Sequence, residues 1–359
     1  MKIRKPLFAL SLGLAATLHA LPASAQSSYV LSKLSAPFLG RLSTASCIDD
    51  SHQVFGEAQY YRRTVFSWTA SGFVTEYYDR AVRWPASKAS SVSPVKLSER
   101  GGISHYSSRC GKLAAQGILV NLATGQETVL PTGNGQPNWT GAKPNEAGVV
   151  LWDAGTWTQA GGTVALPSGG HARIGTIGGI NNRGDVAGYV DADEQGQSRA
   201  AVWLDRQLQV IDPRPDVISV AEAINDQRQV VIKSYPRLPT TSPDVTSSLA
   251  RWHNGVLTPL LPAGDTRFMA EPVINNRGVI MGCVGPSGSQ TCHWGTGRAF
   301  IWREGVLQDL TDLVRAKGAA LPSGAVLIAV QALNDAGSFV ARMRTPNAQD
   351  TVVRLTAVP

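Results

Sequence analysis

A short segment rich in asparagine and aspartate recurs along this chain and constrains its fold more than any other feature. Copies start at Ile180, Ile224, Ile274 and Leu333, and a weaker copy starts at Cys47. In each copy an apolar residue ends one expected strand, and Asn or Asp side chains bond to their own backbone to begin a turn. Glycine then supplies a positive φ, and alternating apolar residues open the next strand. The repeat therefore predicts a series of antiparallel hairpins.

We assign the polar residues of the repeat to turn formation. The residues with this structural role are Asn181, Gly184, Asn225, Asn275, Gly278, Asn334 and Gly337. The alternative is that the Asn/Asp pairs contact a ligand or a metal. Their presence in every copy favours the turn, because folding needs every unit of a repeat array whereas a site rarely does.

Two further elements recur in the same order as the turn segment. Strands that end in tryptophan are expected at Trp84, Trp152, Trp203, Trp252 and Trp302, and residues Thr351–Leu355 follow the same pattern with arginine in the Trp position. A Leu-Pro-x-Gly motif begins at Leu130, Leu166, Leu261 and Leu321. The turn copies are spaced by 44, 50 and 59 residues (180, 224, 274, 333), which is the length of a small four-stranded sheet. Sheets of this length cannot bury both faces alone and must stack.

The sequence therefore predicts an all-β fold, a β-propeller of six or seven four-stranded blades. The last unit lacks its outer strand, and Tyr29–Leu34 has the outer-strand pattern. We expect this N-terminal strand to complete the last blade and leave no unpaired edge. Variable inserts at Ser234–Ser248 and Gly285–Gly297 predict loops on one side of the disc. The one expected helix covers Leu310–Lys317 and ends before Gly318.

The first 25 residues have the pattern of a secretory signal peptide. A basic start precedes the apolar run Leu7–Leu21, and Ala23-Ser24-Ala25 forms a cleavage site before Gln26. We therefore expect one propeller domain over residues 26–359, located in the periplasm or outside the cell. Without Lys2, Arg4 and Lys5, 30 basic residues face 26 acidic ones, a net charge of +4. This weak charge does not predict nucleic-acid binding, and no second apolar segment has the length of a membrane span.

The four cysteines are expected to form disulfides, because export favours oxidation. Cys283 and Cys292 flank an expected strand-to-strand loop, so we pair them, which leaves Cys47 to pair with Cys110 by elimination. A metal site that includes His293 is the alternative. It lacks the usual Cys-x-x-Cys or His-x-x-His spacing.

The segment Arg298–Gly305, together with the Ile/Leu-Asn turn copies, resembles a known bacterial extracellular repeat family. This family is called HAF after its His-Ala-Phe strand, which here reads Arg-Ala-Phe or Arg-Ala-Ala. The resemblance covers residues 171–342 and is poor over residues 97–150. It implies a secreted, propeller-like protein without an established activity, and it contributes no catalytic residue.

The sequence contains no G-x-S-x-G, H-E-x-x-H or P-loop motif, and no G-x-G-x-x-G after an expected strand. The segment Asp191–Gly196 begins like a calcium loop, but Val202 stands where the closing carboxylate is required. We interpret it as a hairpin tip and expect no metal and no cofactor.

Trp139 and Trp294 lie outside the repeat pattern in loops rich in Gly, Pro and Asn, so they are the candidate ligand-binding residues. The sequence favours a monomeric, non-enzymatic recognition module that binds an unknown protein or glycan through loops on one face. The alternatives are a polysaccharide hydrolase or lyase with an axial site, and a structural component of the envelope or matrix. An axial pocket with converging His, Asp, Glu or Arg would favour the enzyme, and an aromatic patch on the loop face would favour binding.

Overall fold

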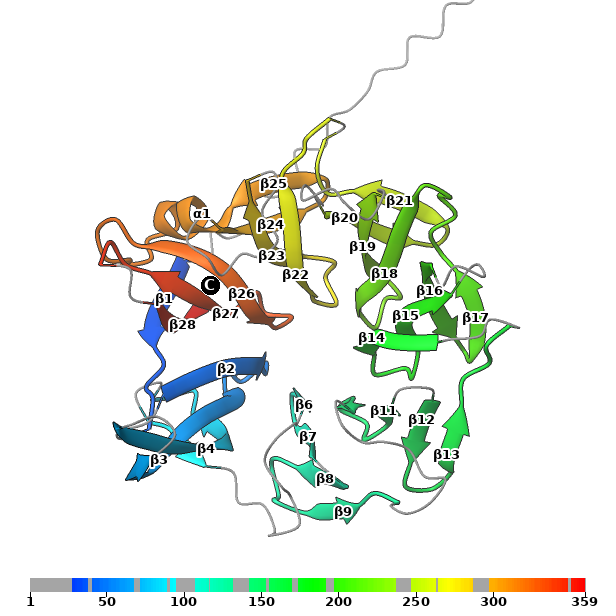
Figure 1. Cartoon of the computed structure of the whole chain (residues 1–359). Helices are drawn as coiled ribbons and strands as arrows, with labels where there is room; N and C mark the ends of the chain where they lie inside the picture. Colours follow the sequence, from blue (N-terminus) through cyan, green and yellow to red (C-terminus); the bar gives the residue numbers. More distant parts are fainter. Residues whose placement is uncertain are drawn as a thin grey trace, which may run out of the picture.

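The computed structural model shows a ring of antiparallel sheets around a common axis (Figure 1). It describes residues 28–37, 41–67, 72–88, 91–94, 107–115, 117–131, 142–152, 155–169, 174–191, 197–236, 247–262, 264–286, 297–347 and 350–358. These residues form seven four-stranded sheets, so the prediction of an all-β propeller is confirmed and the number of blades is seven. We number the blades 1 to 7 along the chain.

Within each blade the strands follow one another from the axis outward. Blades 1 to 3 comprise β2 (Arg41–Ile48), β3 (Val54–Ser67), β4 (Gly72–Trp84) and β5 (Ser93–Pro94); β6 (Ser107–Arg109), β7 (Lys112–Ala115), β8 (Ile118–Asn121) and β9 (Glu127–Val129); and β10 (Lys143–Pro144), β11 (Val150–Trp152), β12 (Gly155–Thr158) and β13 (Gly162–Ala165). Blades 4 and 5 comprise β14 (Ile174–Ile180), β15 (Val186–Asp191), β16 (Ser198–Leu204) and β17 (Gln207–Val210); and β18 (Val217–Ile224), β19 (Val230–Pro236), β20 (Ser248–His253) and β21 (Val256–Pro259).

The last two blades carry the one helix of the described residues and the closure of the ring. Blade 6 comprises β22 (Phe268–Ile274), β23 (Ile280–Gly285), β24 (Arg298–Arg303) and β25 (Val306–Asp309). Helix α1 (Leu310–Ala316) follows directly, with Asp309 capping its first turn, and Gly318 beyond its end has φ +81°. The helix prediction is therefore confirmed. Blade 7 comprises β26 (Val326–Leu333), β27 (Phe339–Arg344), β28 (Asp350–Val358) and β1 (Ser28–Lys33).

The N-terminal strand closes the ring as predicted. β1 pairs antiparallel with β28, in a register that runs from Ser28 opposite Val358 to Lys33 opposite Val353. Tyr29 points inward from β1 and is buried, and its ring lies 5.6 Å from the ring of Phe339 in an edge-to-face contact. The outer edge of the last blade is therefore formed by the first strand of the chain.

The core consists of layers between neighbouring blades. The second strands are buried on both faces, as in β15 and β19, because each lies in the middle of its sheet and each sheet packs against two others. Five tryptophans hold equivalent places in the third strands of their blades, each opposite the first residue of the second strand: Trp84, Trp157, Trp203, Trp252 and Trp302. The hydrophobic burial that a single blade cannot achieve is thus supplied by its neighbours.

Two predicted strand positions are wrong. Trp152 lies in the second strand of blade 3, and Trp157 takes the repeated Trp position, since it pairs with Val150. In blade 7 the Trp position belongs to Leu355, which pairs with Phe339, and not to Arg354. The guanidinium of Arg354 is buried and donates to the backbone oxygens of His52, Pro85 and Ala86 in blade 1.

The repeated asparagines do more than form turns. The Oδ1 atom of Asn225 accepts the backbone N–H groups of Gln227 and Gln229, which builds the turn, while its Nδ2 donates across the blade boundary to the backbone oxygen of Asn275 at 2.8 Å. The same cross-blade bond joins Asn145 to Asn181, Asn181 to Asn225, Asn275 to Asn334, and Asn334 to Asp49. One side chain therefore shapes a turn and ties its blade to the next.

Blade 2 lacks this asparagine, because its first turn is the tight pair Cys110-Gly111. Here the predicted Cys47–Cys110 disulfide is confirmed, with Cα atoms 5.5 Å apart, and it joins blade 1 to blade 2. Cys283 is also disulfide-bonded, and its predicted partner Cys292 lies outside the described residues. At the boundary between blades 2 and 3, neither a repeated amide nor a disulfide connects the described residues.

Replacing Tyr29 with Ala should lower the free energy of unfolding by about 3 kcal/mol, since it removes a buried aromatic ring from the closing strand. Its neighbour Val30 is 53% exposed, so Val30→Ala should change stability by less than about 0.5 kcal/mol. Urea denaturation of both variants measures the difference. Equal stabilities would show that β1 does not hold the ring closed.

Replacing Asn225 with Ala should cost about 2 kcal/mol, because two backbone N–H groups and one buried carbonyl lose their partner. Gln227→Ala in the same turn is the matched control, since its side chain is exposed. Thermal and urea unfolding measure both variants. An Asn225→Ala protein as stable as the control would contradict the cross-blade role.

Candidate functional site

The two faces of the disc carry different connections. The turns between first and second strands, with their asparagines, lie on one face, which we call the turn face. The connections between second and third strands lie on the other, which we call the loop face. The predicted inserts fall between β19 and β20 and between β23 and β24, and so belong to the loop face. Trp139 and Trp294, the predicted ligand-binding residues, lie outside the described residues, as do residues 192–196 of the hairpin tip.

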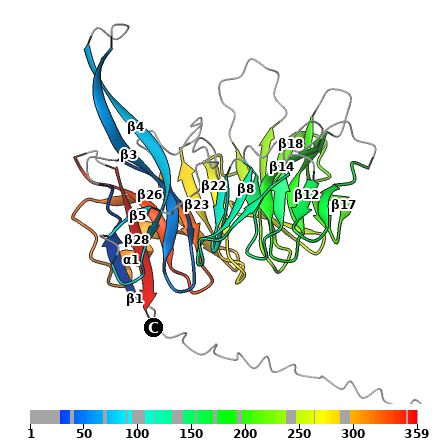
Figure 2. The ribbon, with the colours of Figure 1, turned by 90° about the horizontal axis from the view of Figure 1, so that it is seen from below.

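A long hairpin rises from the loop face of blade 1 (Figure 2). β3 has 14 residues and β4 has 13, whereas β2 beside them has eight. β2 pairs with β3 only as far as Gln59, and β5 pairs with β4 only at Val82 and Arg83. Beyond these points the two strands pair only with each other. We call residues 60–67 and 72–79 the hairpin arm.

One face of the hairpin arm is aromatic and exposed. Thr64 and Thr75 lie opposite each other with their hydroxyl oxygens 3.3 Å apart, and the hydroxyl of Tyr61 lies 3.3 Å from that of Thr64. Phe73 is two residues from Thr75 and therefore shares this face. Phe73 is 79% exposed and Tyr61 is 37% exposed. These residues form what we call the aromatic face of the arm.

The sequence analysis missed this arm. Its residues continue the alternation of an ordinary strand pair, so no break in the pattern marks the point where the strands leave the disc. The available signal is distance: 29 residues separate Phe55 from Trp84, whereas 16 separate Ala187 from Trp203 in blade 4.

The inner strands surround an axial cavity of about 560 Å³ that opens on the turn face. The strands β2, β14, β18, β22 and β26 each contain a bulge just before the turn. The residues three positions before the repeated Asn or Asp line the cavity: Ser46, Gly178, Glu222, Pro272 and Gln331. The repeat thus gives each of these blades one residue at the axis, and its identity changes from blade to blade. The constant distance of three residues between these positions and the repeated Asn or Asp could have identified them from the sequence.

Glu222 is the acidic residue among these axial positions. Its Oε1 lies 3.6 Å from Nζ of Lys233, and the side chains are 19% and 14% exposed. Burial raises the pKa of Glu222, and the positive charges of Lys233 and Lys143 offset this only in part. Gly178 permits the close packing beside it, because a Cβ atom there would lie 2.1 Å from the backbone oxygen of Ala221.

A buried ion pair joins the turns of blades 4 and 5. Arg228 has a φ of +59° in the turn position that Gly184 fills in blade 4, and its guanidinium donates to Asp185 at 2.9 Å and to Asp205 at 2.6 Å. The Asp185 side chain is 1% exposed. Burial favours its neutral form, but hydrogen bonds from Arg228, Asn181 and the backbone of Asp205 hold the pKa of Asp185 below its ordinary value.

The described residues contain no group of three or more His, Cys, Asp or Glu side chains placed to hold a metal ion. The one described helix is too short to cross a membrane. The axial cavity is lined by charged and polar residues together with apolar ones such as Ile224 and Leu333. Among the described residues, the exposed aromatic side chains lie on the arm.

The sequence matches no protein-family model and no curated protein. The fold is similar to the β-propeller domain of the Trilobed protease from Pyrococcus furiosus, with a TM-score of 0.51, 11% identity, and coverage of 90% of this chain and 96% of that one. That domain is described as having an open velcro topology, whereas here β1 pairs with β28. An acylaminoacyl peptidase from Pyrococcus horikoshii is similar with a TM-score of 0.51 and 10% identity, and the match covers 89% of this chain and 52% of the peptidase. At these identities the likeness shows the propeller fold alone.

The ion pair predicts a pH dependence of stability. Because the pKa of Asp185 is lower in the folded than in the unfolded chain, its contribution is full above the unfolded pKa of about 4 and is lost as the pH falls through the folded value. Asp185→Asn should therefore cost about 2 kcal/mol at pH 7 and flatten the loss of stability below pH about 4. Urea midpoints between pH 7 and pH 2.5 measure both effects.

Asp205→Asn is the matched control, because Asp205 contacts the same arginine but its side chain is 75% exposed. It should have a smaller effect at every pH. An Asp185→Asn protein with the acid sensitivity of the unmodified chain would contradict this account.

Proposed function

We propose that this protein is an exported recognition module that binds a partner protein through the aromatic face of the hairpin arm. The observation that carries the proposal is the exposure of Phe73 and Tyr61 on a ribbon that extends beyond the disc. Tyrosine, phenylalanine and arginine are enriched at protein interfaces, and Arg62 and Arg63 are exposed beside Tyr61.

The low intrinsic stability of the arm also favours a partner protein. A two-stranded ribbon is at best marginally stable in water, and the arm exposes apolar surface on strands that pair with nothing else. A covering protein would bury that surface and order the ribbon. A glycan or a small molecule would instead need a concave site that encloses it, which a projecting ribbon does not provide.

Export is part of the proposal. It is supported by the signal-like residues 1–25 and by the Cys47–Cys110 disulfide, since disulfides persist in oxidising compartments. The resemblance of the turn copies and of Arg298–Gly305 to HAF repeats agrees with the same location. A partner in the cell envelope or outside the cell follows from it.

A photo-reactive amino acid at position 73 should crosslink one defined partner protein in the cells that make this protein. The matched control position is Val306, which is 57% exposed on the outer strand of blade 6 and should give no such product. Mass spectrometry identifies the product. Phe73→Ala should then weaken binding of the purified partner by about tenfold or more, as at interface hot spots.

Equal labelling from positions 73 and 306 would contradict the proposal. A product with twice the mass of this chain would also contradict it, because the arm would then bind a second copy. Replacing residues 62–76 with Asn-Gly should abolish binding of the partner while the disc keeps its melting temperature, since the ribbon then closes in a short hairpin turn.

A further inference from the structure

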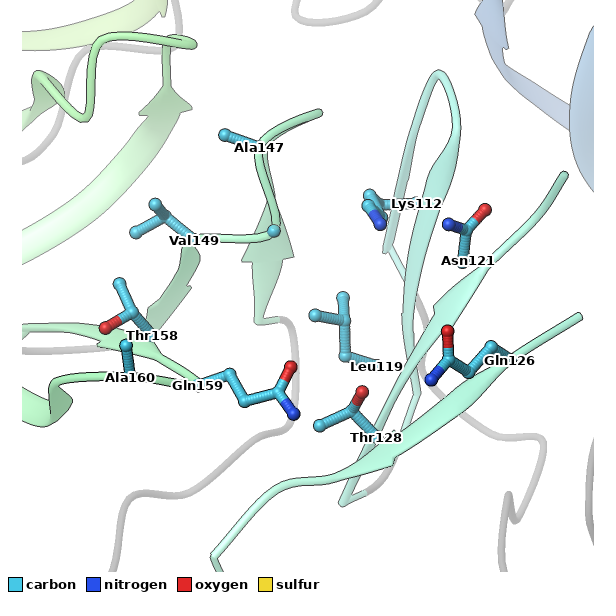
Figure 3. A pocket seen from close by; sticks show the side chains of 11 residues that line it. Lys112, Leu119, Asn121, Gln126, Thr128, Ala147, Val149, Thr158, Gln159 and Ala160 are labelled. Carbon is cyan, nitrogen blue, oxygen red and sulfur yellow. The ribbon is translucent and has the colours of Figure 1, made fainter. Parts of the chain in front are cut away.

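A polar slot lies between blades 2 and 3 on the turn face, remote from the arm (Figure 3). Its volume is about 320 Å³. Blade 2 contributes Lys112, Leu119, Asn121, Gln126 and Thr128, and blade 3 contributes residues 147–149 and 158–160. Gln126 and Thr128 of blade 2 and Gln159 of blade 3 point toward the space between the two blades (Figure 3).

No side chain of the turn in blade 3 closes the slot. Gly148 stands three residues after the repeated asparagine, as Gly184, Gly278 and Gly337 do in blades 4, 6 and 7, whereas Arg228 holds this place in blade 5. In blade 5 the arginine side chain crosses to Asp185 and Asp205 of the preceding blade. At Gly148 no side chain crosses, and a Cβ atom there would only just contact Leu119 and Lys112, at 3.8 and 3.9 Å.

The hydrogen-bonding groups around the slot are available to a ligand. Within the described part of the chain, no carboxylate lies within salt-bridge distance of Lys112, and the side chains of Gln126, Thr128 and Gln159 have no hydrogen-bond partner. Asn121 uses its Oδ1 for the backbone of Ala123, which leaves its Nδ2 as a donor. At other boundaries on this face polar groups of neighbouring blades bond to each other, as Asn182 does with Asp226 and Asn276 with Asp335.

The lining of the slot also carries a positive charge and includes a buried apolar residue. Lys112 is the one ionisable side chain among the eleven lining residues, so the slot is positive. Leu119 lines the slot and is buried in the apolar layer between the two blades, which also includes Trp157. An apolar base with a few polar groups around it is the usual composition of a small-molecule site.

From these observations we infer that the slot binds a sugar acid of monosaccharide size. The ammonium group of Lys112 would donate a hydrogen bond to the carboxylate of the sugar acid. Because both groups are charged, this bond is stronger than one between neutral groups. The amides of Gln126 and Gln159 can both donate and accept, and Asn121 can donate through its Nδ2, which matches the hydroxyl groups of a sugar. The volume is at the lower end of the range of about 300–1,000 Å³ found for ligand sites, which fits a single ring.

Isothermal titration of the purified protein with D-glucuronate tests the inference. D-Glucose supplies the hydroxyl groups without the charge, and acetate and inorganic phosphate supply the charge without the ring. Glucuronate should bind at least about tenfold more tightly than each of the three. Lys112→Met should reduce its affinity to that of glucose, whereas Lys33→Met on the exposed edge of blade 7 should have no effect.

Thr128→Trp provides a second variant, because it fills the slot from the outer strand and leaves Lys112 in place. It should abolish binding of glucuronate, with near-UV circular dichroism confirming that both variants remain folded. Glucuronate binding no tighter than that of glucose, acetate or phosphate would overturn the inference. Unchanged binding by Lys112→Met or Thr128→Trp would overturn it as well.

Discussion

The amide of one asparagine in each of blades 3 to 7 is the interaction on which the disc depends. Its oxygen fixes the turn of its own blade while its nitrogen bonds to the backbone of the next, from Asn145 around to Asp49. Each blade needs its neighbours for burial of its faces, and this amide sets the position of one neighbour relative to the other. A buried amide satisfied at both ends also avoids the cost of unpaired polar atoms in the core.

The two boundaries of blade 2 lack the cross-blade asparagine, and each is built differently. Between blades 1 and 2 a covalent bond, Cys47–Cys110, takes over from the amide. Between blades 2 and 3 the apolar layer around Trp157 is in contact, while the polar rim above it stays apart and forms the slot. The place where the repeat is weakest in sequence is thus also where the described surface offers a cavity between blades.

Much of this fold could be predicted from the sequence, because each unit must repeat the same turn chemistry. The turns at Asn181, Asn225, Asn275 and Asn334, the closing strand and the helix all follow from local residues. The position of Trp152 was wrong because blade 3 has short strands, and two tryptophans five residues apart fit one pattern equally well. Only the pairing of Val150 with Trp157 decides between them. The arm and the slot were missed for another reason: they depend on strand length and on which residue faces a neighbouring blade, and neither changes the local pattern.

The register of the closing strand has a consequence for how the chain acquires its shape. Ser28 pairs with Val358, so the first strand of the ring finds its partner only when the last strand of the ring has been synthesised. Contacts between such distant residues form slowly because a long loop must close first. During synthesis the ring is therefore an incomplete circle with an unpaired edge at each end until β28 emerges from the ribosome. Closure of the native circle must follow the synthesis of that strand.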